Sequence, residues 1–109
     1  MTLLQRNKDD LPTALCAASA SMLMGAFAAI RDYGLRVPED ISLIGIDEVD
    51  MAVYPTPPLS IVATSCEAAA KETVLRLIEL VEQGKASQSD YVIPDVDLYL
   101  RKSVRQIQD

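Results

Sequence analysis

Residues 12–48 read PTALCAASASMLMGAFAAIRDYGLRVPEDISLIGIDE, in which two strand-like runs flank a helix-like run. Residues 13–17 (TALCA) form a short apolar run that is typical of a buried strand. Residues 41–46 (ISLIGI) are rich in β-branched side chains and predict a second buried strand. A helix over residues 20–33 lies between them. Because strand–helix–strand units favour a right-handed crossover between parallel strands, we expect the two strands side by side in one sheet.

The predicted helix over residues 20–33 has clear ends. Ser19 offers a hydroxyl oxygen that caps a first turn, and Gly34 suits the left-handed position that follows a last turn. Its apolar side chains face nearly every direction: Met22, Leu23, Met24, Ala26, Phe27, Ala29 and Ile30. A helix that is apolar all round is buried on more than one side. We expect one side to cover the sheet and another to meet a larger core or a second subunit.

The chain continues the alternation of strands and helices. Residues 60–63 predict a third strand, parallel to the first two. Thr64 and Glu67 have the spacing of a capping box and open a second helix, which ends at Gly84. One apolar stripe runs along this helix: Ala70, Val74, Leu77, Ile78 and Val81. The sequence therefore predicts an α/β fold with a parallel, Rossmann-like sheet and helical crossovers.

Two segments are less regular. Residues 51–59 (MAVYPTPPL) form a loop stiffened by prolines. Residues 91–93 and 95–100 read as one strand broken or bent at Pro94, and residues 101–109 read as a polar tail.

Composition and charge exclude several classes of function. The 109 residues include ten basic and sixteen acidic side chains, which gives a net charge of −6. Because nucleic acids and anionic membranes are bound through basic side chains, we expect this chain to contact neither. It has no apolar run of about 20 residues, and its first ten residues lack the pattern of a signal peptide. Two isolated cysteines, Cys16 and Cys66, fit a reducing, cytoplasmic compartment.

No catalytic or metal site is expected. His is absent, which removes the most common general base and the most common transition-metal ligand. Asp47, Glu48 and Asp50 form an acidic cluster, but no second cluster of oxygen ligands accompanies it. A cation site or a small enzyme built on these acids is therefore the weakest interpretation. We expect the chain to use no cofactor and to be no enzyme.

Three stretches together resemble the LacI/GalR-type transcriptional regulators. They are residues 12–48, residues 56–62 (TPPLSIV) and residues 97–103 (DLYLRKS), and the run GLRVPEDISLIGIDE is the most specific part. Members of this family carry an N-terminal helix-turn-helix and two Rossmann-like subdomains that clamp a small ligand. The resemblance implies the C-terminal third of such a regulator, part of a periplasmic-binding-protein-like type I fold. It also implies a fragment or the product of a truncated gene.

The resemblance divides the chain into parts. Residues 1–63 and 91–105 would belong to the C-terminal subdomain, whereas residues 64–90 would cross the hinge and form a helix of the N-terminal subdomain. Nothing corresponds to the DNA-binding helix-turn-helix. The implied function is ligand sensing and dimerisation within a cytoplasmic regulator, whose small-molecule effector is a sugar or a nucleobase.

Candidate ligand contacts follow from two arguments. Ligands of open α/β sheets bind outside the carboxyl ends of the strands, which selects Ser19 after the first strand and Asp47 after the second. The resemblance selects the same positions, although the family usually has Ala-Asn-Asp at Ala18-Ser19-Ala20. Thr64 stands where a hinge Gln is common. Structural interpretations stay open beside these: Ser19 and Thr64 as helix caps, and Asp47 as a solvated acid or an N-cap.

The resemblance also implies a homodimer. Positions of the family's dimer contacts hold Met24, Phe27, Met51 and Tyr54, and Met and aromatic side chains are typical of interfaces. The alternative to a regulator is the C-terminal part of a sugar-binding protein of a transport system. A helix-turn-helix upstream in the parent gene would favour the regulator, and a signal peptide there would favour transport.

Overall fold

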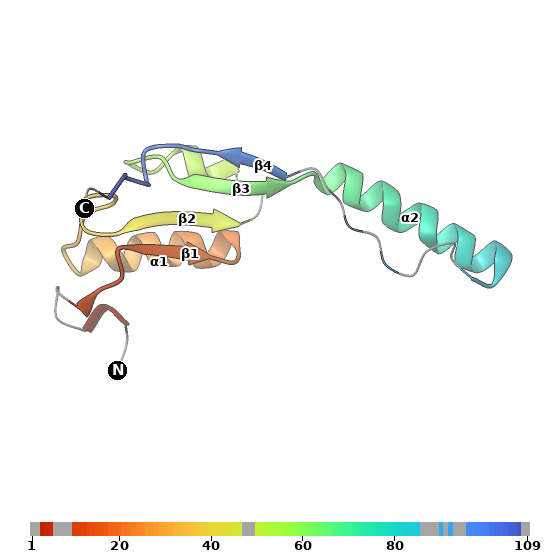
Figure 1. Ribbon diagram of the computed structural model, residues 1–109, viewed down its shortest axis with the longest axis horizontal. Coiled ribbons are helices and arrows are strands. Elements are labelled where there is room, and N and C mark those ends of the chain that lie inside the picture. The colour runs from red at the N-terminus through yellow and green to blue at the C-terminus, as the bar shows by residue number, and fades with distance from the viewer. Residues whose placement is uncertain are drawn as a thin grey trace. The chain divides into compact units, whose positions relative to one another are not determined.

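The computed structural model describes residues 3–5, 10–46, 50–85, 90, 92 and 96–107. The chain divides into two compact units: unit 1 comprises Met1–Ala63 and Leu98–Asp109, and unit 2 comprises Thr64–Asp97. The elements, shown in Figure 1 and with η for a short 3-10 helix, are η1 (Leu3–Gln5), β1 (Ala14–Ala17), α1 (Ala20–Asp32), β2 (Ser42–Ile46), η3 (Asp50–Val53), β3 (Ser60–Thr64), α2 (Cys66–Gln83) and β4 (Val96–Tyr99).

The sheet has the strand order β1-β2-β3-β4. β1 pairs in parallel with β2, with Ala17 opposite Gly45. β2 pairs in parallel with β3, with Ile46 opposite Val62. The predicted set of three parallel neighbouring strands is therefore confirmed. In Figure 1 the arrows of β3 and β4 point in opposite directions.

α1 begins and ends where the sequence predicts, to within one residue. The Oγ atom of Ser19 accepts a hydrogen bond from the backbone N–H of Met22 at 3.3 Å, which caps the first turn. After the last helical residue, Asp32, Gly34 has a φ of +73°. Glycine enters this left-handed region without the steric cost that a β-carbon brings.

α1 covers one face of the sheet and runs along β1 and β2, as Figure 1 shows. Leu23 and Ile30 on its inner side are 0% and 1% exposed, whereas Met22 on another side is 58% exposed. The buried apolar cluster joins Leu23 and Ile30 to Ala17, Leu35, Val37, Ile41, Leu43, Ala52, Leu59, Ile61 and Ala63. Since each fully buried Leu or Ile side chain contributes roughly 1.5–3 kcal/mol, this cluster is the main source of stability in unit 1.

α2 starts one residue later than the capping box predicts. Its N-cap is Ser65, whose Oγ atom accepts a hydrogen bond from the backbone N–H of Ala68 at 3.2 Å. Thr64 is instead the last residue of β3, so the prediction that it caps the helix is wrong. Thr64 and Ser65 are adjacent hydroxyl residues. Thr64 belongs to the strand because its β-branched side chain favours extended backbone. The helix ends at Gly84, as predicted, with a φ of +71°.

The C-terminal segment is more ordered than a polar tail. β4 confirms part of the strand predicted over residues 95–100, whereas residues 91 and 93–95 lie outside the described residues. Ser103 is fully buried, so residues 101–105 are not simply the polar tail that the sequence predicts over residues 101–109. The side chains of Arg101 and Ser103 donate hydrogen bonds to the backbone carbonyls of Leu59 and Leu43. Hydropathy alone does not predict such contacts.

Two further observations concern the described residues only. No helix among them is long and apolar enough to cross a membrane. Both cysteines, Cys16 and Cys66, are free thiols with exposed side chains.

Candidate functional site

Ser19 lies just beyond the carboxyl end of β1, where the chain turns into α1. It is half-buried, and its Oγ atom is 3.3 Å from that of Ser21 in addition to the bond from Met22. A hydroxyl has one donor hydrogen and two acceptor lone pairs. Because the cap engages one lone pair, the Ser19 hydroxyl keeps its hydrogen for Ser21 or for a ligand.

The carboxyl ends of β1 and β2 lie at the same edge of the sheet, because Ala17 is opposite Gly45 in a parallel pair. In open α/β sheets, the residues that follow the carboxyl ends of the strands are the ones that contact ligands. Ser19 follows β1 directly in this way. Asp47, the second candidate, and its neighbour Glu48 lie outside the described residues.

Thr64, the third candidate, ends β3 and has an exposed side chain. It is the first residue of unit 2, whereas Ser19 belongs to unit 1. Its hydroxyl is not consumed as a helix cap, since Ser65 takes that role.

The four candidate dimer contacts fall into two classes. Met24 and Phe27 on α1 are half-buried and pack against the core. Met51 and Tyr54 are 61% and 78% exposed. Between these two, Ala52 is fully buried and its carbonyl accepts a hydrogen bond from the N–H of Leu59 at 2.7 Å. This anchor fixes η3 and leaves its two large apolar neighbours in solvent.

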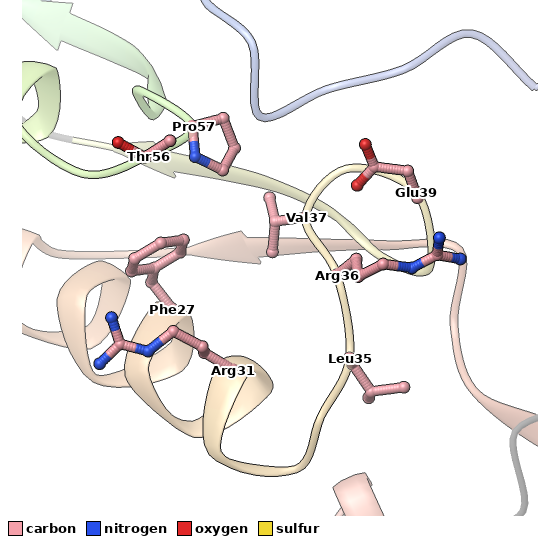
Figure 2. Close-up of a pocket in the computed structure, with 8 residues that line it drawn as sticks. All are labelled: Phe27, Arg31, Leu35, Arg36, Val37, Glu39, Thr56 and Pro57. Carbon is pink, nitrogen blue, oxygen red and sulfur yellow. The ribbon is translucent and has the colours of Figure 1, made fainter.

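A surface pocket of about 260 Å³ lies beside the candidate dimer contacts rather than at the strand ends. Its lining, drawn in Figure 2, comes from the second half of α1, the turn after it and the loop before β3: Phe27, Arg31, Leu35, Arg36, Val37, Glu39, Thr56 and Pro57. In Figure 2 the guanidinium groups of Arg31 and Arg36 point to opposite sides. Ligand sites combine an apolar pocket with converging polar groups, so these diverging charges do not favour one here.

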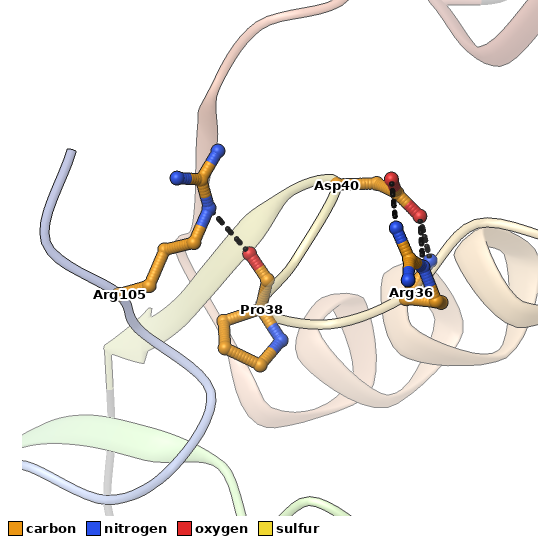
Figure 3. A network of polar contacts seen from close by, with 4 residues as sticks. All are labelled: Arg36, Pro38, Asp40 and Arg105. Atoms are coloured by element: carbon orange, nitrogen blue, oxygen red, sulfur yellow. Dashed lines mark hydrogen bonds and ion pairs between the residues drawn. The ribbon is translucent and has the colours of Figure 1, made fainter. Parts of the chain in front are cut away.

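Arg36 is engaged by Asp40 within its own turn, as Figure 3 shows. Asp40 Oδ2 accepts hydrogen bonds from the backbone N–H and from Nε of Arg36, at 2.8 and 3.0 Å, and Oδ1 accepts from Nη2 at 3.0 Å. The side-chain hydrogen bond and then the negative charge of Asp40 raise the pKa of Arg36. The hydrogen bonds from the Arg36 guanidinium to Asp40 close the turn that leads into β2.

The part of the chain that the structure describes contains no group of three or more His, Cys, Asp or Glu side chains that could hold a metal ion. Asp50, the described member of the acidic cluster, is exposed at the start of η3.

Comparison with known sequences identifies relatives along almost the whole chain. A family model described as a periplasmic binding protein-like domain matches residues 1–104. The HTH-type transcriptional repressor PurR of Glaesserella parasuis is 34% identical over 106 residues, which cover 93% of this chain and 31% of that protein. The ribose operon repressor of Haemophilus influenzae is 32% identical over 99 residues, covering 89% and 29%. The chain thus spans about a third of the length of the curated relatives it matches.

Comparison with solved structures gives the same result as comparison with sequences. A Lac repressor dimer bound to operator and the anti-inducer ONPF superposes with a TM-score of 0.76 at 35% identity, covering 90% of this chain and 34% of that one. The regulator CelR in complex with cellobiose gives a TM-score of 0.74 at 28% identity, covering 84% and 28%. These relatives confirm the predicted resemblance and the predicted α/β fold class. The chain belongs to the periplasmic binding protein-like domain family, in the form that LacI-type transcriptional regulators carry.

Proposed function

We propose that this chain is the ligand-sensing and dimerisation portion of a LacI-type transcriptional regulator and has no enzymatic activity. The observation that carries the proposal is the similarity to transcriptional repressors over 93% of the chain. These relatives are repressors and regulators, which favours a regulator over a component of a transport system. A regulator of this kind acts in the cytoplasm, and that location is part of the proposal.

The proposed effector site lies at the carboxyl edge of the sheet, with Ser19, Asp47 and Thr64 as contacts. Support comes from the parallel register of β1 and β2, which brings their carboxyl ends to one edge, and from the spare hydrogen of the Ser19 hydroxyl. The effector is a sugar or a nucleobase. Solved relatives are described in complex with cellobiose and lactose, whose hydroxyl groups can donate hydrogen bonds to a carboxylate such as that of Asp47.

We also propose an assignment of the chain to two subdomains. Residues 1–63 and 91–105 form the C-terminal subdomain, and residues 64–90 cross the hinge and supply a helix to the N-terminal subdomain. The compact units support the first boundary, because they separate between Ala63 and Thr64, whereas their second boundary lies between Asp97 and Leu98 rather than after residue 90. Dimer contacts are assigned to Met24, Phe27, Met51 and Tyr54, of which the exposed Met51 and Tyr54 offer the larger free apolar surface.

A titration followed by amide NMR tests the effector site on the chain itself. The titration uses ribose or cellobiose up to about 50 mM. This concentration is well above a dissociation constant of about 1 mM, so even a weak complex is populated. We expect shifts confined to the amides around Ser19, Asp47 and Thr64. Glycerol at the same concentration is the control for non-specific hydroxyl effects. Shifts spread evenly over the chain, or no shifts with any sugar or nucleobase, would contradict the proposed site.

A further inference from the structure

The segment after β4 is held to unit 1 by polar contacts rather than by apolar packing. Among the residues that the structure describes, the buried apolar cluster runs from Ala17 to Ala63. Three apolar side chains of the C-terminal segment are largely exposed, with Leu98, Leu100 and Ile107 at 61%, 67% and 52%, and Val104 is half-buried. Ser103, by contrast, is 0% exposed. What fixes this segment is therefore its hydrogen bonds.

Ser103 joins β2 to the start of β3. Its Oγ atom accepts a hydrogen bond from the backbone N–H of Ser60 at 2.7 Å and donates one to the carbonyl of Leu43. Its own carbonyl accepts a bond from the backbone N–H of Leu43 at 2.8 Å. One buried residue thus occupies backbone groups of two neighbouring strands at once.

Arg101, two residues earlier, binds the start of β3 as well. Its backbone N–H donates to Ser60 Oγ at 2.8 Å, and its Nη1 donates to the carbonyl of Leu59 at 2.7 Å. Ser60 is itself fully buried. The amino end of β3 is therefore held by two residues of the C-terminal segment, Arg101 and Ser103.

Arg105 completes the attachment at the start of β2. Its backbone N–H donates to Ser42 Oγ at 3.1 Å, and its Nε donates to the carbonyl of Pro38 at 3.0 Å, as Figure 3 shows. Pro38 lies in the turn that the Arg36–Asp40 pair closes, and the N–H of Asp40 also donates to the carbonyl of Arg36 at 2.9 Å. Arg105 therefore holds a turn that is already fixed.

We propose that residues 101–105 form a detachable strap, which opens as one unit while β1, α1, β2 and β3 stay folded. Opening exchanges hydrogen bonds within the protein for hydrogen bonds with water, so its net cost is modest. No member of the buried apolar cluster belongs to residues 101–105. Segments with few buried apolar contacts open locally ahead of the global transition.

The strap has a consequence for the connection between the two units. Unit 2 is joined to unit 1 at Ala63–Thr64 and again at Asp97–Leu98. The strap follows that second connection by a few residues, and it is hydrogen-bonded to the amino ends of β2 and β3. An open strap leaves this second connection held to unit 1 through the pairing of β4 in the sheet. Since the proposed effector site lies at the carboxyl edge of the same strands, opening leaves that edge intact.

Amide hydrogen exchange under native conditions tests the strap. In the unaltered chain we expect the amides of Ser60, Arg101 and Arg105 to exchange with one common opening, faster than the Leu23 amide, which bonds to Ser19 within α1. Ser103→Ala removes one acceptor and one donor, and it should raise exchange of the strap amides about 10- to 100-fold, with Leu23 unchanged. Lys102→Ala, an exposed neighbour, is the matched control and should change neither group.

Two results would overturn the strap. Equal loss of protection in the strap and at Leu23 would mean that the segment opens only with the whole unit. Unchanged exchange at Ser60 and Arg101 in Ser103→Ala would mean that these hydrogen bonds do not hold it. If Ser103→Ala fails to fold, Arg101→Met removes the bond to the carbonyl of Leu59 and the contact of the guanidinium with the Tyr99 ring, 5.6 Å from its centroid, while the backbone bond to Ser60 stays. Its expected effect is a smaller rise, about 3- to 10-fold, confined to the same strap amides.

Discussion

The side chain of Leu23 on α1 fills the space directly above Gly45 of β2. A β-carbon on Gly45 would lie 2.5 Å from Cδ2 of Leu23 and 3.2 Å from its Cδ1. Leu23 is 0% exposed, so the methyl groups that would have to move have no free space around them. We predict that Gly45→Ala destabilises the chain by about 1–3 kcal/mol through overpacking, measured by urea unfolding.

Gly25→Ala is the control for that measurement. Gly25 lies inside α1 with an exposed surface, and no atom lies within 4 Å of the position that its β-carbon would take. Replacing it should stabilise by about 0.5–1 kcal/mol, because alanine has the higher helix propensity. Two Gly→Ala changes of opposite sign would confirm the Leu23–Gly45 contact. A neutral Gly45→Ala would show that Leu23 can move aside.

The Ser19 cap gives a second prediction. Ser19→Ala removes the acceptor for the Met22 N–H and should cost about 0.5–2 kcal/mol of unfolding free energy. Ser19→Asn keeps a side-chain oxygen of equal capping strength, so the stability should stay near that of the unaltered chain. Thermal unfolding of both variants by circular dichroism is the measurement. Equal loss in both would show that the cap is not what Ser19 contributes.

A parallel pair tests the start of α2. Ser65→Ala removes the acceptor for the Ala68 N–H and should lower the helix content of unit 2, whereas Thr64→Ala leaves the cap in place. The expected difference between them is about 1 kcal/mol. Amide exchange at Ala68 and Ala69 reports it directly. A larger effect of Thr64→Ala would restore the capping box that the sequence suggests.

The sequence predicts the elements that apolar patterns control. Residues 13–17 and 41–46 form strands and residues 20–33 a helix because their spacing decides which side chains reach the core. Patterns of this kind do not distinguish adjacent hydroxyl residues, so the capping-box spacing indicates Thr64, whereas Ser65 is the cap. The β-branched side chain of Thr64 favours extended backbone and belongs to β3, which leaves the cap to Ser65.

The strap shows a second limit of sequence reasoning. Residues 101–105 read as polar surface, since Arg, Lys and Ser are usually exposed. Their role depends on backbone groups of Leu43, Leu59 and Ser60, which lie about forty to sixty positions away in the chain. No local pattern encodes such partners. Of the candidate site, the sequence locates Ser19 at the strand end correctly, and the ligand role of Ser19, Asp47 and Thr64 stays a prediction.

Effector binding by this chain alone should be weak. We predict a dissociation constant above about 1 mM, or weaker than roughly −4 kcal/mol, for ribose, cellobiose or a free nucleobase. Ser19 and Ala20 replace the polar pair usual in the family, and the chain spans about a third of its curated relatives. Titration calorimetry is the measurement. Micromolar affinity for any of these ligands would show that the described edge of the sheet suffices by itself.

The chain should also self-associate. α2 has no buried residue, and its stripe members Val74, Leu77, Ile78 and Val81 are 54%, 59%, 45% and 78% exposed. If pairing buries the exposed half of each, the four side chains contribute roughly 3–6 kcal/mol per copy. Two copies then supply about 6–12 kcal/mol against the entropic cost of association. We therefore expect dimers of the 11.9 kDa chain in sedimentation velocity as its concentration rises tenfold through the micromolar range.

Two surfaces compete for that dimer, and charge substitutions separate them. Leu77→Glu places a carboxylate in the α2 stripe, and Met51→Glu places one on η3, where the side chain is 61% exposed. Met51 is a sharper probe than Met24, because Met24 packs against the core and a charge there would also disturb folding. Gln83→Glu makes the same change in charge on the other side of α2 and is the control. Whichever substitution yields monomers while the control still dimerises identifies the interface. A single 12 kDa species for the unaltered chain at every concentration would refute self-association through either surface.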